Sequence, residues 1–448
     1  MSELVEKIKG LRHNGLFIAI VIGVLIRLLL IPFALEYDTN YWALVIRNVE
    51  SGNGLYFMEG YYYTPVWGYI LSLAAGIQNA FFNAGDPSSV CYELLSYSTR
   101  DLYAYTDMAS SIAILFILKV MLWICDLVLA LTVYNLVEER TEDKRKAIIA
   151  FVLVFICPHV IGASSVVVMP DVISAMFTML TIMLLKHERF FLAGMCYSFA
   201  VWVKFFPIAI ILFLLCYIYV KAQGDRKESA KRISLAIAGF MGSSAIIFLP
   251  QMMEGTIMRS LAFFTDRVVE IINFGFSFIL LAVFLGILVI GVAIFIAKHM
   301  LRSWEDVDDR MMEYSMVILA ICMLLYTNMQ YLVTLIPFLV YCIIVVENRY
   351  KYIWAALAVA GVILTFMLNT NVNMLNSLIV YTGMISADSV LPVFNALNDE
   401  VFFGFSFVDI MCSIGNNIQK IMLICIPPAF ILRRLIADNK IPRWHHER

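Results

Sequence analysis

The chain has 448 residues, of which 62% are hydrophobic and 15% are charged, with a formal net charge of −2 and a mean hydropathy of +0.85. Soluble domains have about 45–50% apolar and about 25% charged residues, so this composition excludes an ordinary soluble enzyme. Apolar runs recur from Leu16 to Leu435, which excludes a soluble domain on a single anchor, and no basic stripe indicates nucleic-acid binding.

The apolar runs predict a polytopic, all-α transmembrane bundle. A helix that crosses the hydrocarbon core needs about 20 mostly apolar residues. About twelve runs approach this length: residues 15–34, 112–137, 147–163, 171–185, 190–203, 206–220, 233–250, 274–297, 315–326, 330–346, 353–368 and 418–435. One more run, residues 65–82, would reverse the orientation of every later helix if it crossed the membrane.

The distribution of basic residues predicts the orientation of the bundle. Lysine and arginine in short loops near helix ends mark the cytoplasmic side. If residues 65–82 do not span, the cytoplasmic loops and termini contain 24 of the 32 basic residues. Both termini are therefore predicted to be cytoplasmic, and residues 65–82 to form a re-entrant or surface helix on the outer side. Three outer loops are then long: residues 35–111, 251–273 and 369–416.

The first outer loop opens on an acidic and polar sequence, Glu36-Tyr37-Asp38-Thr39-Asn40-Tyr41. A carboxylate at the outer mouth of a bundle can act as a general base toward a hydroxyl group. Asp38 also precedes an expected helix, where Asp is a favoured N-cap, and position alone favours that structural role. Residues 39–47 fit an amphipathic helix that lies in the membrane interface.

Several ionisable residues fall at membrane depth, where they are costly and often functional. Arg27 lies in the outer half of its helix, where it could instead snorkel to the headgroups. Lys119 and Asp126 are seven residues apart on one helix and could pair structurally. Lys204 stands in a break between two apolar runs, just before Pro207, and a cation there suits an anionic ligand.

Cations are scarce in the outer loops, and two of them lie together. Arg259 and Arg267 share the loop 251–273 with Asp266. Arginine offers a fork of donors for phosphate, although an exposed Arg–Asp pair is an equal alternative. Gln330 and Tyr331, before Pro337, by themselves indicate only a short loop. The chain has no phosphate-binding loop, no dinucleotide fingerprint and no zinc-ligand spacing.

Taken in order, these motifs resemble a known family. The motif residues are Asp38 and Tyr41, then Tyr61-Tyr62-Tyr63-Thr64-Pro65 with Trp67-Gly68, Lys119 and Asp126, Pro158, Ser164, Ser165 and Asp171, Gly194, Lys204 and Pro207, Arg259 to Arg267, and finally Gln330, Tyr331 and Pro337. They resemble the GT-C superfamily of membrane glycosyltransferases that use polyprenyl-phosphate sugars. The similarity is greatest to GPI mannosyltransferase I type enzymes and to bacterial polyprenyl-phosphomannose-dependent mannosyltransferases.

The resemblance implies an inverting transfer of a hexose from a polyprenyl-phosphate donor to a glycolipid or glycan acceptor outside the cytoplasm. Asp38 would be the catalytic base. The donor phosphate would bind Lys204, Arg267, Arg259 and Arg27. Sugar or acceptor would contact Asn40, Tyr41, Tyr62, Tyr63, Asp171, Gln330 and Tyr331. Lys119 and Asp126 would be structural buried charges. The family motif is often Asp-x-Asp, and Asp38-Thr39-Asn40 keeps only its first carboxylate, which disfavours a divalent metal; no cofactor is firmly expected.

The resemblance covers about three quarters of the chain. It predicts a catalytic module at residues 1–350, followed by C-terminal helices at 351–448 whose outer loop 369–416 would choose the acceptor. The membrane is predicted to be a prokaryotic plasma membrane. A transporter or flippase for a lipid-linked sugar is the alternative. Such proteins often have internal repeats, which this sequence lacks, and the long one-sided loops favour catalysis. A non-catalytic assembly subunit is the third alternative.

Overall fold

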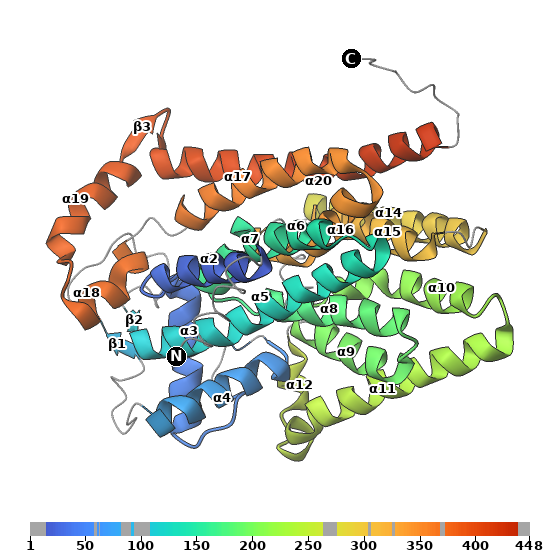
Figure 1. Ribbon diagram of the computed structural model, residues 1–448. Helices are drawn as coiled ribbons and strands as arrows, with labels where there is room; N and C mark the ends of the chain where they lie inside the picture. Colours follow the sequence, from blue (N-terminus) through green and yellow to red (C-terminus); the bar gives the residue numbers. More distant parts are fainter. Residues whose placement is uncertain are drawn as a thin grey trace, which may run out of the picture.

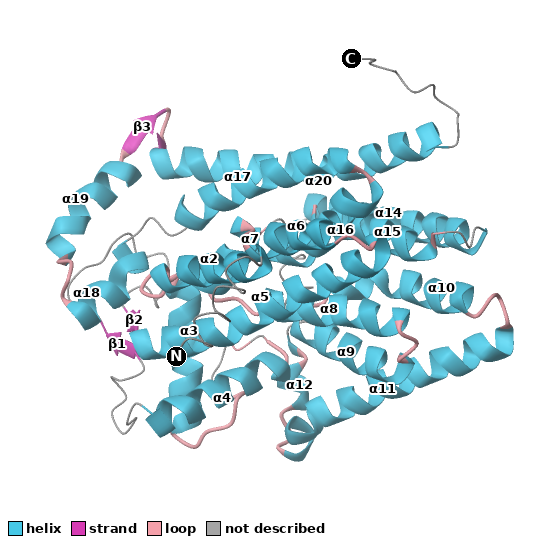
Figure 2. Ribbon diagram, viewed as in Figure 1, coloured by secondary structure: helices cyan, strands magenta, loops and turns pink. Residues whose placement is uncertain are grey.

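The computed structural model describes residues 15–57, 61, 63–81, 91–93, 108–262, 276–302, 306–324, 328–367 and 372–437, so that Tyr62 and Arg267 lie outside the described residues. This part of the chain is almost entirely helical (Figure 1, Figure 2). The first half comprises α2 (Gly15–Leu29), α3 (Glu36–Glu50), α4 (Pro65–Phe81), β1 (Cys91–Glu93), β2 (Met108–Ser110), α5 (Ile112–Thr141), α6 (Lys144–Phe155), α7 (Pro158–Gly162), η2 (Ala163–Val167), α8 (Asp171–Lys186), α9 (Phe190–Val203), η3 (Phe206–Ile210) and α10 (Ile211–Lys221). The second half comprises α11 (Arg226–Met253), α12 (Ile257–Ser260), α14 (Phe276–Arg302), α15 (Val307–Met323), η4 (Met329–Thr334), α16 (Ile336–Tyr341), η5 (Cys342–Val346), η6 (Asn348–Tyr350), α17 (Lys351–Met367), η7 (Val372–Leu375), α18 (Asn376–Thr382), α19 (Ala387–Asn398), β3 (Glu400–Phe402), β4 (Phe405–Ser406) and α20 (Phe407–Ala437).

The predicted helical bundle is confirmed, but the prediction of about twelve spans is wrong. Among the described residues, four helices are long and apolar enough to cross a membrane: α5, α11, η6 with α17, and α20. A fifth arises if α6 and the segment Pro158–Val167, bent by 42° at their junction, form one span. The apolar runs at 171–185, 190–203 and 206–220 form α8, α9 and α10, of which the longest has 16 residues. Sixteen residues reach about 24 Å, which is short of a hydrocarbon core of about 30 Å. The long helices suggest a multi-pass membrane protein.

One element of the first loop, α3, differs from expectation, whereas α4 agrees with the prediction that residues 65–82 do not span. α3 forms where a helix was predicted, but its apolar face packs against protein, because Trp42 and Val45 are only 1% and 0% exposed. It is therefore not a helix whose apolar face rests in the bilayer surface. α4 has 17 residues and is not among the candidate spans.

The C-terminal region packs on the rest of the bundle through α17 and α20. α17 contacts α7 and α20, and α20 contacts α15. His159 of α7 lies 2.8 Å from the buried amide of Gln419 on α20. α20 begins at Phe407 and not near residue 418, so the predicted outer loop 369–416 contains α18, α19, a β-hairpin and the first turns of α20.

Helices α9 and α11 approach closely through glycine. A Cβ atom on Gly194 would lie 1.9 Å from the carbonyl oxygen of Ala236, and one on Gly239 would lie 2.0 Å from that of Phe191. Small residues allow helix backbones to make such contacts in membranes. The two glycines therefore fix the spacing of α9, whose C-terminal end carries Lys204.

Replacing Gly239 by alanine is expected to destabilise the protein by about 1–3 kcal/mol, because the new methyl group forces α9 and α11 apart. Gly242, one turn along α11, is exposed, and a Cβ atom added there would have no neighbouring atom within 4 Å, so Gly242→Ala is the matched control. It should be neutral or slightly stabilising, because alanine favours a helix over glycine. Thermal unfolding in detergent, followed by a dye that reacts with the newly exposed buried cysteines, measures both. Equal melting temperatures in the two variants would contradict the close approach.

Candidate active site

The break after α9 directs Lys204 into the protein. α9 ends at Val203, Lys204 has extended backbone angles (φ −148°, ψ 141°), and η3 follows with Pro207 in its first turn. The hydroxyl of Tyr197 donates to the carbonyl of Pro207 at 2.9 Å and so ties the break to α9. Lys204 is only 6% exposed. The Pro207 signal in the sequence therefore marked a real interruption that carries a buried cation.

Lys204 lies among an acid and two tyrosines. Its Nζ donates to the hydroxyl of Tyr63 at 3.3 Å and lies 3.7 Å from Oδ2 of Asp171. The same atom lies 4.7 Å from the ring centroid of Tyr63 and 5.3 Å from that of Tyr331. Cation–π contacts at these distances stabilise an ammonium that has left water. Three residues predicted for the site, Tyr63, Asp171 and Tyr331, are thus brought around Lys204.

Asp171 is a buried carboxylate with unused acceptor capacity. It is the first residue of α8 and is fully buried. Within the described part of the chain, neither of its carboxylate oxygens accepts a hydrogen bond. Buried polar groups are normally hydrogen-bonded, so this pair of oxygens is suited to accept hydroxyl groups from a ligand.

Asp38 belongs to the same electrostatic cluster. It is the third residue of α3, whose N-cap is Leu35 without any side-chain cap bond, so the N-cap interpretation of Asp38 is wrong. Burial raises the pKa of Asp38 to about 7, the nearby Lys204 ammonium opposes the rise, and the Asp171 carboxylate adds to it. A carboxyl group with a pKa near neutrality is matched to proton transfer at physiological pH. We call Asp38, Lys204 and Asp171 the acid–lysine cluster.

Aromatic side chains surround the acid–lysine cluster. The ring of Trp42 lies 5.0 Å from that of Tyr63 and 5.5 Å from that of Trp67, and Phe206 lies 4.8 Å from Tyr331. Trp67 belongs to the sequence motif at residues 61–68, whereas Trp42 and Phe206 were not predicted to lie at the site, because nothing in their spacing marked them as its neighbours.

A strained backbone segment leads into Asp171. The π-helix η2 ends at Val167, and the next residue, Val168, has a φ of +57°, a left-handed conformation that is rare for a β-branched residue. The indole of Trp42 donates to the carbonyl of Val168 at 3.2 Å and helps to hold it. π-helical turns and strained residues cluster at functional sites, which agrees with the position of this segment beside the cluster.

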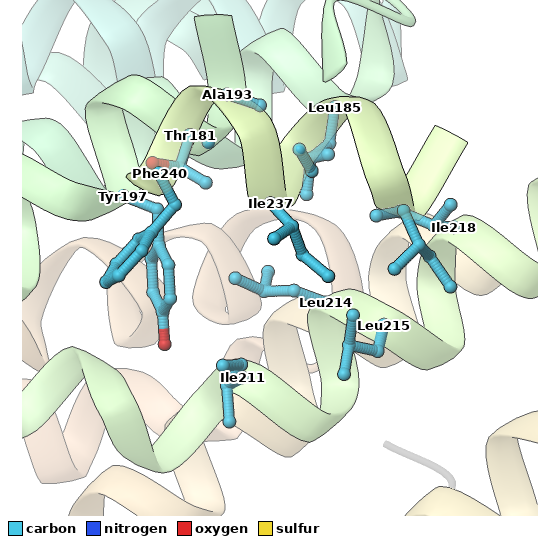
Figure 3. A pocket seen from close by; sticks show the side chains of 13 residues that line it. Thr181, Leu185, Ala193, Tyr197, Ile211, Leu214, Leu215, Ile218, Ile237 and Phe240 are labelled. Carbon is cyan, nitrogen blue, oxygen red and sulfur yellow. The ribbon is translucent and has the colours of Figure 1, made fainter. Parts of the chain in front are cut away.

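An apolar cavity lies among α8, α9, α10 and α11. It has a volume of about 140 Å³, is partly open, and is lined by side chains of α8, α9, α10 and α11, including Leu185, Ile211, Leu214 and Phe240 (Figure 3). Tyr197, which holds the carbonyl of Pro207, also lines it. The cavity surface is almost wholly apolar, so its contents must be apolar too.

Arg27, Asp126 and Lys119 are also buried, and their partners are not members of the acid–lysine cluster. Nε and Nη2 of Arg27 donate to Oδ2 of Asp126 at 3.0 and 2.8 Å, and Nη2 also donates to the carbonyl of Phe155. Lys119 donates to the carbonyls of Leu30, Ile31 and Phe33 at the end of α2. The suggested Lys119–Asp126 pair is therefore wrong, because Asp126 pairs with Arg27. Arg27 is fully buried, so it does not snorkel, and its contacts are with Asp126 and not with the acid–lysine cluster.

Breaking the Arg27–Asp126 pair is expected to cost about 3–5 kcal/mol of stability, because a single replacement leaves one buried charge without its partner. Arg27→Met should therefore lower the melting temperature strongly. The double variant Arg27→Met/Asp126→Leu should recover much of the loss and should keep whatever activity the wild type has. Loss of activity in a well-folded double variant would restore the predicted phosphate-binding role of Arg27.

The remaining predicted residues lie around the cluster or away from it. Arg259 is exposed on α12, and its Nη1 donates to the carbonyl of Tyr56 at 3.1 Å. The hydroxyl of Tyr56 in turn donates to the carbonyl of Tyr63, so Arg259 contacts the loop that carries Tyr63. Asn40 is buried, and its amide oxygen accepts from the hydroxyl of Ser110, which is a structural contact between α3 and β2. Tyr41 and Gln330 are half-buried.

Comparisons with known proteins do not assign this chain to a family. A scan against protein-family models finds no match to this chain, and a search of curated proteins finds no significant match.

Proposed function

We propose that this protein is a membrane glycosyltransferase that transfers a hexose from a polyprenyl-phosphate donor to a glycolipid or glycan acceptor. Mannose is the hexose we propose first. The observation that carries the proposal is the acid–lysine cluster. It joins a carboxyl group of near-neutral pKa, a buried ammonium and an unsatisfied carboxylate from three distant segments of the chain. All three residues belong to the ordered motifs of the sequence.

Asp38 supplies the base in this proposal. The acceptor hydroxyl attacks the anomeric carbon of the donor, and Asp38 accepts the hydroxyl proton as the new C–O bond forms. The bond between the anomeric carbon and the phosphate oxygen breaks, and the electron pair leaves with the polyprenyl phosphate. A single displacement of this kind inverts the anomeric centre.

Lys204 stabilises the leaving group in this proposal. Fixed charges aimed at developing negative charge usually make the largest contribution to catalysis, above all in a site with little water. The ammonium has three donors, and Asp171 and Tyr63 orient it. Asp171 also offers its oxygens to sugar hydroxyls. Arg259, on the surface near Tyr56, would help to attract the anionic donor.

The apolar cavity supports a lipid-linked donor. One of its lining residues, Tyr197, donates a hydrogen bond to the carbonyl of Pro207, just after the break that carries Lys204. Part of an isoprenoid tail in this cavity would pack against Tyr197, seven residues before Lys204 on α9. A soluble nucleotide sugar has no group that would occupy such a surface.

A flippase for lipid-linked sugars remains the second candidate. Transporters bind substrates at interrupted helices, and both the Lys204 break and the 42° bend after α6 are interruptions of this kind. A flippase would move the donor across the bilayer without cleaving it.

Purified protein in nanodiscs, supplied with radiolabelled polyprenyl-phosphate mannose and a panel of glycolipid acceptors, tests the proposal. Labelled acceptor is the expected product, and the exposed Glu254 at the end of α11 provides a control variant, Glu254→Gln, that should retain activity. Transport of intact donor in proteoliposomes, without any product in the nanodiscs across a panel of donor sugars, would contradict it in favour of the flippase.

A further inference from the structure

A β-hairpin of exposed phenylalanines precedes the last helix. β3 and β4 pair antiparallel, and Phe403 and Gly404 form the turn with φ angles of 48° and 81°. The exposed fractions are 62% for Phe402, 86% for Phe403 and 55% for Phe405. Phenylalanine has no polar group to hydrate, and contiguous exposed apolar patches mark membrane or protein contacts.

The hairpin is fixed rigidly to α20. The backbone N–H and the hydroxyl of Ser406 donate to Oδ2 of Asp409 at 3.0 and 2.7 Å, and the N–H of Asp409 donates to the hydroxyl of Ser406 at 3.1 Å. This reciprocal arrangement is a capping box, which satisfies the first backbone donors of a helix. The direction of the hairpin is therefore set by the direction of α20, a candidate membrane span.

The exposed apolar surface of α20 runs up to the hairpin. Its members recur at spacings of seven or three residues, which places them on one side of a helix. They are at least 42% exposed and comprise Phe407, Ile414, Ile421, Ile424 and Ile431. In a bilayer this stripe would face lipid, and Figure 1 shows β3 next to the N-terminal end of α20.

The hairpin lies at the depth of the lipid headgroups. Gly415 of α20 packs against Leu364, three residues before the end of α17, since an added Cβ would lie 2.8 Å from Leu364 Cγ. Phe407 is eight residues, or about 12 Å, further along α20, which places it roughly 8 Å beyond the end of α17. Headgroup regions extend about 5–7 Å on each side of the hydrocarbon core.

We propose that the hairpin at residues 400–406 is a membrane anchor that inserts Phe402, Phe403 and Phe405 into the interfacial region of the bilayer crossed by α20. Aromatic residues favour this region. The segment between α17 and α20 contains η7, α18, α19 and the hairpin, and its η7–α18 end contacts other parts of the protein. The hydroxyl of Ser377 donates to the carbonyl of Ser110 at 2.6 Å, and the N–H of Ala34 donates to the carbonyl of Met374 at 3.3 Å. The anchor therefore holds α18 and α19 between the bilayer surface and the segment that leads into α3.

Tryptophan fluorescence in the full-length protein tests this anchor. The Phe403→Trp variant would be placed in nanodiscs made with lipids brominated near the headgroup. The emission of the seven native tryptophans would be measured in the wild type and subtracted. Ile431→Trp, on the exposed stripe of α20, is the lipid-facing reference, and Lys227→Trp, exposed in the first turn of α11, is the aqueous reference. All three positions are exposed, so the variants should fold normally.

The anchor predicts that bromine quenches the added emission of Phe403→Trp about as strongly as that of Ile431→Trp, while acrylamide in water quenches it far less than that of Lys227→Trp. Strong acrylamide quenching without bromine quenching would place the hairpin in water and overturn the proposal. Protection from both quenchers would place it against protein, a second copy or another chain, and would overturn it equally. The measurement involves no sugar transfer, so its outcome is independent of the proposed enzymatic function.

Discussion

Replacing Asp38 by asparagine is expected to lower kcat/KM for sugar transfer by about 10²–10⁴-fold, because the acceptor hydroxyl loses the group that takes its proton. Asparagine keeps the size of the side chain, and Asp38 is not a helix cap, so α3 should form normally in the variant. Donor binding should persist, since Lys204 remains in place. Initial rates of sugar transfer in nanodiscs measure the effect, with Glu254→Gln as the control variant. A wild-type rate in Asp38→Asn would contradict the assignment of Asp38 as the catalytic base.

The pH dependence of the rate should carry the signature of the same group. Asp38 is active as a base only when it is ionised, and burial raises its pKa to about 7. The rate of the wild type should therefore rise with pH, reach half its plateau near pH 7, and level off above it. The residual activity of Asp38→Asn should not show this rise with pH. A rate profile that levels off near pH 4, the range of an ordinary carboxyl group, would contradict the assignment.

The same pKa shift has a defined effect on stability. The folded protein holds the Asp38 proton more tightly than the unfolded chain, whose carboxyl group has a pKa of 3.8. The stability contributed by the protonated group is therefore fully present below about pH 4 and is lost as the pH rises through about 7. Thermal unfolding over this range should show a weaker pH dependence in Asp38→Asn than in the wild type; the part that remains comes from Asp171, whose pKa burial raises to about 6.

Replacing Lys204 by methionine is expected to abolish measurable transfer. Removing one group that stabilises developing charge in a dry site costs about 10²–10³ in rate, and here the donor phosphate would also lose its main anchor. The replacement also leaves Asp171 buried without a counter-charge, which destabilises the fold. The single variant alone therefore does not separate a catalytic role from a structural one.

A double variant separates the two roles of Lys204. Lys204→Met/Asp171→Asn contains neither charge, so it should recover most of the melting temperature lost in Lys204→Met. It should still fail to transfer sugar, because the phosphate has no cation to receive it. Recovery of both stability and transfer would show that the Lys204–Asp171 contact at 3.7 Å is only structural.

The order of motifs in the sequence indicated which residues lie around Lys204 better than hydropathy indicated the number of spans. Lys204 could be identified because Pro207 interrupts an apolar run, and a lysine at such an interruption has few structural explanations. Tyr63, Asp171 and Tyr331 followed from their order along the chain, and all three contact Lys204. The number of spans could not be obtained in this way, because hydropathy does not show where an apolar run ends as a helix of 11 or 14 residues.

The sequence also could not predict which side chains from distant segments pair with each other. Lys119 and Asp126 share a helix, so their spacing suggested a pair, yet Arg27 reaches Asp126 from another helix, α2. Helix spacing describes one surface and carries no information about the residue that packs against it. The same limit hid Trp42, whose indole bonds to Val168 across 126 positions of the chain. Both contacts depend on tertiary packing.

A single-turnover experiment tests the central claim most directly. Protein in nanodiscs is loaded with radiolabelled polyprenyl-phosphate mannose and then mixed with the acceptor that the panel identifies, for the wild type and Asp38→Asn in parallel. The account predicts that the wild type forms product with the anomeric configuration inverted, whereas Asp38→Asn holds the donor and forms almost none. Equal product from both proteins, or product with retained configuration, would contradict a single displacement assisted by Asp38.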